Sequence, residues 1–304
     1  MLTIFATAKP FQGQFASIQR NAIQSWTLLQ PRPEVILFGD DKGTAEVAKE
    51  LGVEHEPKVE LSDYGTPLLN DLFEKAQNRA SYDLLCYVNA DIILMSDFMA
   101  ALRQVANQMP RFLMVGQRMD VDVKGPIDFS MGWEEKLRAY VSQHGRLQSP
   151  TGIDYFAFRR GMWGDIPGFA IGRPAFDNWL LYRACALGAS LVDATNVTTA
   201  IHQNHDYSHV PTGASGVWQG PEAKRNLELT GGRQHLYSIR DATHRLAPSG
   251  VGLVIKRKYF FSQLTVISRL YTRLAAYKDG GKALTVKYCR SLWLLLRGHV
   301  RTGE

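Results

Sequence analysis

An acidic residue set between two apolar runs constrains this chain more than any other stretch. Residues 83–97 read D-L-L-C-Y-V-N-A-D-I-I-L-M-S-D. Leu84–Val88 is a short apolar run typical of a buried strand, and Ile92–Met95 is a second apolar run. Asn89 and Asp91 lie between them. A carboxylate in such a place is costly to bury unless a cation or hydrogen-bond donors meet it.

The position of Asp91 predicts a ligand site. In an open α/β sheet, ligands bind outside the carboxyl ends of the strands, where Asp91 would stand. Oxygen ligands there suit Mg²⁺ or Mn²⁺ carrying a diphosphate, because Mg²⁺ is usually held by one or two carboxylates plus phosphate oxygens. The alternative is an aspartate that only caps the turn after the strand.

Length and composition fit a packed globular protein. The chain has 304 residues, of which 45% are hydrophobic and 21% charged, enough for one large α/β domain or a domain with an appendage. Its three cysteines, Cys86, Cys185 and Cys289, are widely spaced, which argues against a disulfide framework or a zinc site. No secretory signal pattern opens the sequence and no apolar stretch is long enough to span a membrane, so we expect a cytoplasmic protein.

Strand and helix patterns alternate through the first half of the chain. The expected strands are Leu2–Thr7, Glu34–Phe38, Val53–His55, Leu84–Val88, Phe112–Gly116, Tyr155–Phe158, Ser190–Ala194 and Val197–His202. The expected helices are Gln14–Leu29, Thr44–Leu51, Pro67–Arg79 with Thr66 as its N-cap, Asp97–Gln108, Trp133–Val141 and Asp177–Leu187. This alternation predicts an α/β fold with a doubly wound, mostly parallel sheet flanked by helices.

The last fifty residues differ in character, so we divide the chain into residues 1–245 and 246–304. Residues 254–300 place basic residues beside aromatic and leucine faces at helical spacing. This pattern suits helices that lie on an anionic membrane surface, here the inner face of a membrane. The alternative is two amphipathic helices that pack on the rest of the chain or on another subunit, as in an oligomer. No nucleic-acid-binding motif accompanies the charge, so no nucleic-acid partner is expected.

Three blocks resemble the nucleotide-sugar-dependent glycosyltransferases of the GT-A fold, nearest in pattern to family-2-like members. Y-V-N-A-D-I-I-L (Tyr87–Leu94) is similar to the acidic metal motif of that family, usually D-x-D. F-R-R-G-M-W-G-D-I-P-G-F (Phe158–Phe169), followed by F-D-N-W-L-L (Phe176–Leu181), is similar to the acceptor-side block. A-I-H-Q-N-H (Ala200–His205) resembles the late histidine that some members add to the metal shell. The resemblance covers roughly residues 1–210.

The resemblance implies a GT-A-type catalytic domain with a C-terminal helical appendage. It implies a divalent cation, Mn²⁺ or Mg²⁺, held by Asp91 and His202, and Asp177 as the catalytic base. Two positions depart from the family pattern: Asn89 replaces the first acid of the metal motif, and Phe176-Asp177 replaces a Glu-Asp pair. A single carboxylate there is consistent with an inverting mechanism. The alternative for Asp177 is an N-cap of a helix that begins at Asn178.

Further candidates for binding the nucleotide sugar follow the predicted strands. They are Lys9, Asp40, Asn89, Asp91 and Asp154. Lys9 would contact phosphate, unless it is a solvated surface lysine. Asp40 would contact the nucleoside, a role it could exchange with the adjacent Asp41. Asp154 would bind a sugar hydroxyl, or it is a turn residue.

Histidines follow the last of these strands. A His-x-x-His pair such as His202 and His205 would suit zinc, but no cysteines accompany it, and His202 is preferred as the ligand.

The leading hypothesis is therefore a metal-assisted, inverting glycosyltransferase that uses a UDP-sugar and a glycan or lipid-linked acceptor, as in polysaccharide biosynthesis. A sugar-nucleotide pyrophosphorylase would need a glycine-rich phosphate loop after the first strand, and Ala6–Pro10 does not supply one. A third hypothesis is a non-catalytic GT-A-like module that binds a membrane or a partner. It predicts no turnover, and nucleotide binding that is absent or indifferent to metal.

Overall fold

A computed structural model describes residues 1–206 and 213–254 of the chain. Met1–Val254 form one compact unit. The basic helices expected over residues 254–300 lie outside the described residues, apart from Val254 itself. The described helices include none that is long and apolar enough to cross a membrane.

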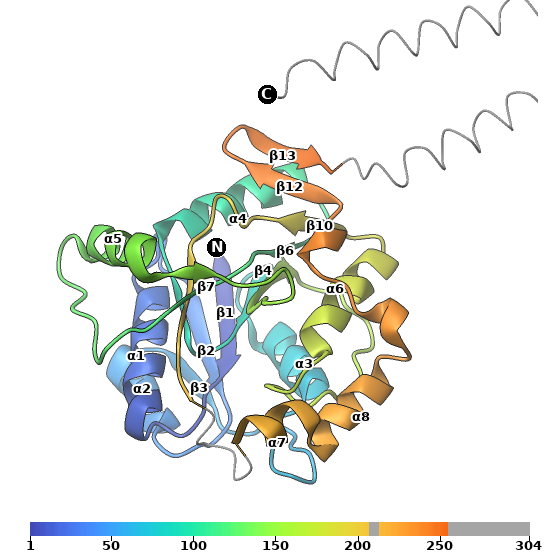
Figure 1. Cartoon of the computed structure of the whole chain (residues 1–304), viewed down its shortest axis with the longest axis horizontal. Coiled ribbons are helices and arrows are strands. Elements are labelled where there is room, and N and C mark those ends of the chain that lie inside the picture. The colour runs from blue at the N-terminus through green and yellow to red at the C-terminus, as the bar shows by residue number, and fades with distance from the viewer. Residues whose placement is uncertain (207–212, 255–304) are drawn as a thin grey trace, which may run out of the picture. The chain divides into compact units, whose positions relative to one another are not determined.

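Within the described residues, a nine-stranded sheet forms the centre of the first unit (Figure 1). Its strands lie in the order β13 (Gly250–Leu253), β12 (His244–Ala247), β10 (Ser190–Asp193), β6 (Phe112–Val115), β9 (Tyr155–Arg159), β4 (Leu84–Val88), β1 (Leu2–Thr7), β2 (Glu34–Phe38) and β3 (Glu54–Glu56). Five of the neighbouring pairs run parallel, whereas β9 is antiparallel to both β4 and β6, and β13 is antiparallel to β12. The predicted α/β fold with a mostly parallel sheet is confirmed. Strand β12 spans residues 245 and 246, where the sequence suggested a division.

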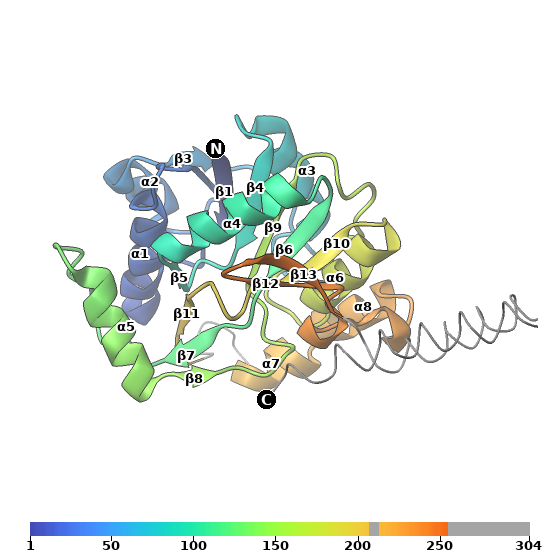
Figure 2. The same ribbon diagram turned by 90° about the horizontal axis from the view of Figure 1, so that it is seen from above.

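Helices cover both faces of this sheet, as the view from above shows (Figure 2). On one face lie α1 (Gly13–Thr27), α2 (Thr44–Leu51) and α4 (Ser96–Gln108), and on the other lie α3 (Leu69–Arg79) and α6 (Phe176–Ala186). The strands are apolar at successive residues because both faces are buried. In β4, for example, Cys86 and Val88 join the first core, while Leu85 and Tyr87 join the second.

A second, four-stranded sheet stands beside the carboxyl end of β4. Its order is β5 (Ile92–Leu94), β11 (Ala200–Gln203), β7 (Met119–Val121) and β8 (Arg146–Leu147), and α5 (Trp133–His144) packs on one face through a small core of its own. Helix α1 fixes β5 in place, since Trp26 Nε1 donates to the Ile92 carbonyl at 2.8 Å and Leu94 N donates to Ser25 Oγ at 3.1 Å. This sheet combines strands from three distant parts of the sequence.

Some local predictions were wrong. Helix α3 begins at Leu69 rather than Pro67, and Thr66 is not its cap. Instead Thr66 Oγ1 donates to Glu222 at 2.9 Å, on α8 (Pro221–Leu229). The sequence patterns also did not predict α7 (Gly213–Gln219), α8 and the β12–β13 hairpin. These segments are short and mix polar with apolar residues, so they show no long apolar periodicity. Contacts with the rest of the first unit stabilise them.

Candidate active site

The predicted site residues of the first unit meet at one edge of the main sheet. Lys9 follows β1, Asp40 follows β2, and Asn89 and Asp91 follow β4. These three strands run parallel, so their carboxyl ends share an edge. Asp154 directly precedes β9, which runs antiparallel to β4 with Tyr155 opposite Val88, and it therefore reaches the same edge.

The second sheet brings histidines to Asp91. Strand β11 lies between β5 and β7, so that His202 is paired with Ile92 on one side and with Asp120 on the other. His202 Nε2 lies 3.8 Å from Asp91 Oδ2, and His205 Nε2 lies 3.2 Å from the same oxygen. The side chain of Gln203, between the two histidines, donates to the Asp91 main-chain carbonyl at 3.2 Å and fixes the backbone there.

Asp91, His202 and His205 form a cluster that fits a divalent metal ion. One ligand atom from each lies within 4.8 Å of the others. Their side chains are only 16%, 12% and 7% exposed. Asp91 Oδ1 is buried and has no hydrogen-bond partner among the described residues. A buried carboxylate oxygen without a donor requires an explanation, and a cation held between it and the imidazoles provides one.

The electrostatics of Asp91 favour the charged form. Burial alone would raise the pKa of Asp91, but the His205 hydrogen bond and the charges of His202 and Lys9 outweigh it and hold that pKa below its usual range. Burial lowers the pKa of Lys9, and the charge of Asp91 opposes this effect. Phe15 on α1 contacts both Lys9 and His205. The centroid of its ring lies 4.6 Å from Lys9 Nζ and 4.9 Å from the centroid of the His205 ring.

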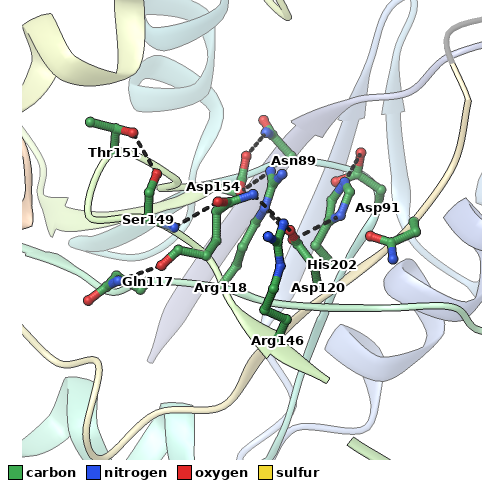
Figure 3. Close-up of polar contacts among 12 residues, drawn as sticks. Asn89, Asp91, Gln117, Arg118, Asp120, Arg146, Ser149, Thr151, Asp154 and His202 are labelled. Atoms are coloured by element: carbon green, nitrogen blue, oxygen red, sulfur yellow. Dashed lines mark hydrogen bonds and ion pairs between the residues drawn. The ribbon is translucent and has the colours of Figure 1, made fainter. Parts of the chain in front are cut away.

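Asn89 belongs to a row of hydrogen-bonded side chains beside Asp91 and His202 (Figure 3). Its Nδ2 donates to Asp154 Oδ1 at 2.5 Å, and its Oδ1 accepts from the Tyr87 hydroxyl at 2.9 Å. Arg118 continues the row, because its guanidinium donates to Asp154 Oδ2 at 2.6 Å and to Asp120 Oδ1 at 2.8 Å. Both polar atoms of the Asn89 amide therefore have hydrogen-bond partners within the protein, and the amide holds the Asp154 carboxylate in place in this structure.

Asp177 lies in the first turn of α6. The helix begins at Phe176, so Asp177 is its second residue and not the N-cap of a helix that starts at Asn178. Its Oδ1 accepts from Asn178 N at 2.8 Å. The preceding Ala175 has φ of 87°, a strained conformation for a residue other than glycine, and such strain is common where function constrains the backbone.

The Asp177 carboxyl titrates near neutrality. Burial, with the charge of Asp154 adding to it, raises the pKa of Asp177 to about 7. Burial also raises the pKa of Tyr87, and the charges of Asp154, Asp91 and Asp177 follow burial as causes. The ring of Phe176, the residue before Asp177, lies 6.4 Å from the Tyr87 ring between centroids, and the charge of Asp154 acts on Asp177 as well, which places Asp177 on the side of the site that Asp154 lines.

Asp40 and Asp41 form a separate acidic pair in the turn after β2. Asp40 is exposed, whereas Asp41 is partly buried, and burial followed by the charge of Asp40 raises the pKa of Asp41. Gly39 before them has φ of 98°, and its carbonyl lies 2.8 Å from His55 Nε2. The pair occupies the end of the strand next to β1, the position expected of a nucleoside contact.

Three residues of the site were not selected from the sequence. His205 lies closer to Asp91 than the preferred His202 does. Its position three residues after His202 was a signal in the sequence that could have identified it. Asp120 and Arg118 lie between the expected strand Phe112–Gly116 and the expected helix Trp133–Val141, where the sequence predicted no strand or helix. The pairing of β7 with β11 brings both residues to the site, and no pattern of consecutive residues predicts that pairing.

Comparisons with known proteins give similarities of fold. A scan of family models and a search of curated proteins found no match to the sequence. Among solved structures, the chain is similar to glucosyl-3-phosphoglycerate synthase from Mycobacterium tuberculosis in complex with Mg²⁺ and uridine diphosphate, at 16% identity and a TM-score of 0.46 over 76% of this chain and 80% of that chain.

Two other solved structures are similar over about two thirds of this chain. S. aureus TarS matches at 10% identity and a TM-score of 0.41, over 67% of this chain and 57% of that chain. A mannosyltransferase from Pyrobaculum calidifontis, in complex with GDP-Man and Mn²⁺, matches at 14% identity and a TM-score of 0.40, over 66% of this chain and 56% of that chain. At these identities the similarity assigns no donor, acceptor or reaction to this chain.

Proposed function

We propose that this protein is a metal-assisted, inverting glycosyltransferase that moves a sugar from a nucleotide sugar, in the first place a UDP-sugar, to a hydroxyl of a glycan or lipid-linked acceptor. The observation that carries the proposal is the buried Asp91 carboxylate, which faces two imidazole nitrogens and keeps one oxygen without a hydrogen-bond partner among the described residues. Asp177, with its pKa near neutrality, supplies a second and separate function in the same site.

Asp91, His202 and His205 would hold the metal ion. A divalent cation there neutralises the charge that develops on the leaving diphosphate. Lys9, whose charge acts on Asp91, would contact a phosphate oxygen on the same side. Asp40 would contact the nucleoside from the end of β2. Asp154, fixed by Asn89 and Arg118, would orient a sugar hydroxyl.

Asp177 would act as the general base on the acceptor hydroxyl. A carboxylate with a pKa of about 7 is sufficiently basic to accept a proton and is largely ionised just above neutral pH. General base catalysis of this kind typically contributes about 10²–10⁴-fold to the rate. The acceptor would attack the sugar from the side opposite the diphosphate, and the configuration at the transferred carbon would invert.

Calorimetric titration of UDP and of GDP, each with and without Mn²⁺, tests the donor site. We expect metal-dependent binding of one nucleotide to the wild type and its loss in Asp91→Ala. Asp128→Ala is the matched control, since Asp128 is an exposed carboxylate that contacts only Ser130 in the described residues. Absence of nucleotide binding by the folded wild type would refute the proposal and favour a non-catalytic module.

A further inference from the structure

The pairing of β7 with β11 places a carboxylate behind one of the two histidines. His202 and Asp120 are register partners in parallel strands, so their side chains project from the same face of the second sheet. Their neighbours Ile201 and Val121 face the other way, into the core under α5. We propose that Asp120 is a positioning residue for the metal site: it fixes the His202 ring so that Nε2, and not Nδ1, faces Asp91 and is the nitrogen that a metal ion would bind. This inference rests on the metal site of the proposed function.

The geometry supports a fixed orientation of the ring. His202 Nδ1 lies 3.3 Å from Asp120 Oδ1, and its Nε2 lies 3.8 Å from Asp91 Oδ2, so the ring stands between two carboxylates. His202 Nδ1 is buried and has no hydrogen-bond partner of normal geometry among the described residues. The Asp120 carboxylate, which can only accept when ionised, is thus the group available to receive a proton from that nitrogen.

Asp120 itself is held in place from several sides. It is 8% exposed. Arg118 Nε donates to its Oδ1 at 2.8 Å (Figure 3). Gln148 Nε2 donates to its Oδ2 at 2.8 Å. A carboxylate restrained in this way can restrain its neighbour, as do the carboxylates that accept from metal-binding histidines in general.

The second histidine shows the same arrangement. His205 Nδ1 lies 2.7 Å from the Asp206 main-chain oxygen, while its Nε2 lies 3.2 Å from Asp91 Oδ2. A carbonyl oxygen only accepts, so a hydrogen bond there requires a proton on Nδ1, and it leaves Nε2 as the nitrogen that faces the Asp91 carboxylate, where a metal ion would replace its proton. Both rings therefore present Nε2 to Asp91 and Nδ1 to an acceptor. For His202 that acceptor is a side chain, and it can be removed by mutation.

Titration of Mn²⁺ alone, without nucleotide, measures the effect on the metal site. We expect Asp120→Ala to bind Mn²⁺ about 10- to 100-fold more weakly than the wild type. Asp120→Asn keeps an acceptor oxygen and should lie between the two. The matched control is Asp128→Ala, which removes an exposed carboxylate outside this arrangement and should leave the affinity within about twofold. Equal Mn²⁺ affinity in the wild type and Asp120→Ala would overturn the inference.

The ¹⁵N chemical shifts of the His202 ring report the tautomer directly, and His202→Gln assigns the signals by their loss. At a pH high enough to make the ring neutral, we expect the Nδ1–H tautomer in the metal-free wild type and a shift toward Nε2–H in Asp120→Ala. A merely structural role for Asp120 would lower the melting temperature without changing the tautomer. An Nε2–H tautomer in the wild type would refute the inference even if neither Asp120 variant folds.

The two measurements separate the inference from the proposed function. If the wild type binds no Mn²⁺, the metal site of the proposed function fails, and the tautomer still decides the role of Asp120. If the wild type binds Mn²⁺ and Asp120→Ala binds it equally well, only the inference about Asp120 fails.

Discussion

At the scale of single residues, the chemistry of the site centres on the Asp91 carboxylate. Its Oδ2 lies near two imidazole nitrogens, and its Oδ1 is buried without a hydrogen-bond partner in the described part of the chain. A ligand set of two imidazoles and one carboxylate suits transition metals better than Mg²⁺, which prefers oxygen ligands alone.

We therefore expect His205→Ala and His202→Ala each to weaken Mn²⁺ binding by about tenfold or more, with His205→Ala at least as damaging because His205 lies closer to Asp91. Both changes should affect Mn²⁺ more than Mg²⁺. Titration of the two metals checks this, with His144→Ala on the outer helix α5 as the control. An unchanged Mn²⁺ affinity in His205→Ala would leave His202 as the only imidazole ligand.

The proposed role of Asp177 as general base predicts a pH dependence of the reaction. As a general base it acts only when ionised, so kcat/KM should rise with pH and level off above its pKa of about 7. In Asp177→Asn, kcat should fall about 10²–10⁴-fold and the remaining rate should lose this pH dependence. Release of the nucleoside diphosphate, followed across pH, measures both. A variant that keeps the wild-type profile would exclude Asp177 as the base.

The same carboxyl should reduce stability above neutral pH. Because its folded-state pKa is raised from 3.8 to about 7, the folded state binds more proton than the unfolded chain between these values, and the free energy of unfolding falls as pH rises through them. We expect Asp177→Asn to be more stable than the wild type at pH above 7, by about 2 kcal/mol after allowing for partial solvent contact, and equally stable at low pH. Urea unfolding at the two pH extremes tests the sign.

At the scale of elements, one guanidinium links the two sheets at the candidate site. Arg118, just before β7, joins Asp120 of the second sheet to Asp154 at the start of β9 in the main sheet. The Arg118 side chain is 22% exposed, and the two carboxylates are about 10% exposed. This ion pair network therefore links the metal side of the site to the Asp154 side.

Removal of Arg118 should leave two largely buried carboxylates without their cation. We expect Arg118→Met to lower the free energy of unfolding by about 3 kcal/mol, since breaking a buried ion pair leaves an uncompensated charge. Arg146→Met is the control: Arg146 is 78% exposed and lies 3.8 Å from Asp120, so its loss should cost less than about 0.5 kcal/mol. Comparable losses in the two variants would contradict the view that Arg118 joins the sheets.

At the scale of the whole molecule, the candidate site lies within the first unit. The predicted contact with a membrane surface concerns the rest of the chain. All the site residues lie within Met1–Val254, the unit that contains both cores of the main sheet. The basic and aromatic pattern of residues 254–300 is known from the sequence alone.

We expect the full chain to sediment with vesicles of anionic phospholipid and less so at high salt, because attraction between basic residues and an anionic surface is screened by ions. A chain ending at Val254 should keep metal-dependent nucleotide binding and lose vesicle binding. Vesicle binding that survives the truncation would assign the membrane contact to the first unit.

The sequence by itself determined where the strands end and hence where Lys9, Asp40 and Asp91 stand. Continuous apolar runs mark strands buried on both faces, and a polar residue directly after such a run must lie at the edge of the sheet. Strands β1, β2 and β4 match the predicted ranges for this reason. These are local patterns, readable from consecutive residues.

Only the tertiary structure decided which side chains complete the site. His202 reaches Asp91, and Asp120 reaches His202, through pairings of β11 with β5 and β7, strands that lie far apart in the sequence. Thr66 likewise is not the predicted N-cap, because α8 supplies Glu222 from a distant segment and Glu222 accepts the Thr66 hydrogen bond. Short strands carry little periodicity, and contact with distant segments determines their pairing, so the ligands around Asp91 could be identified only in the folded chain.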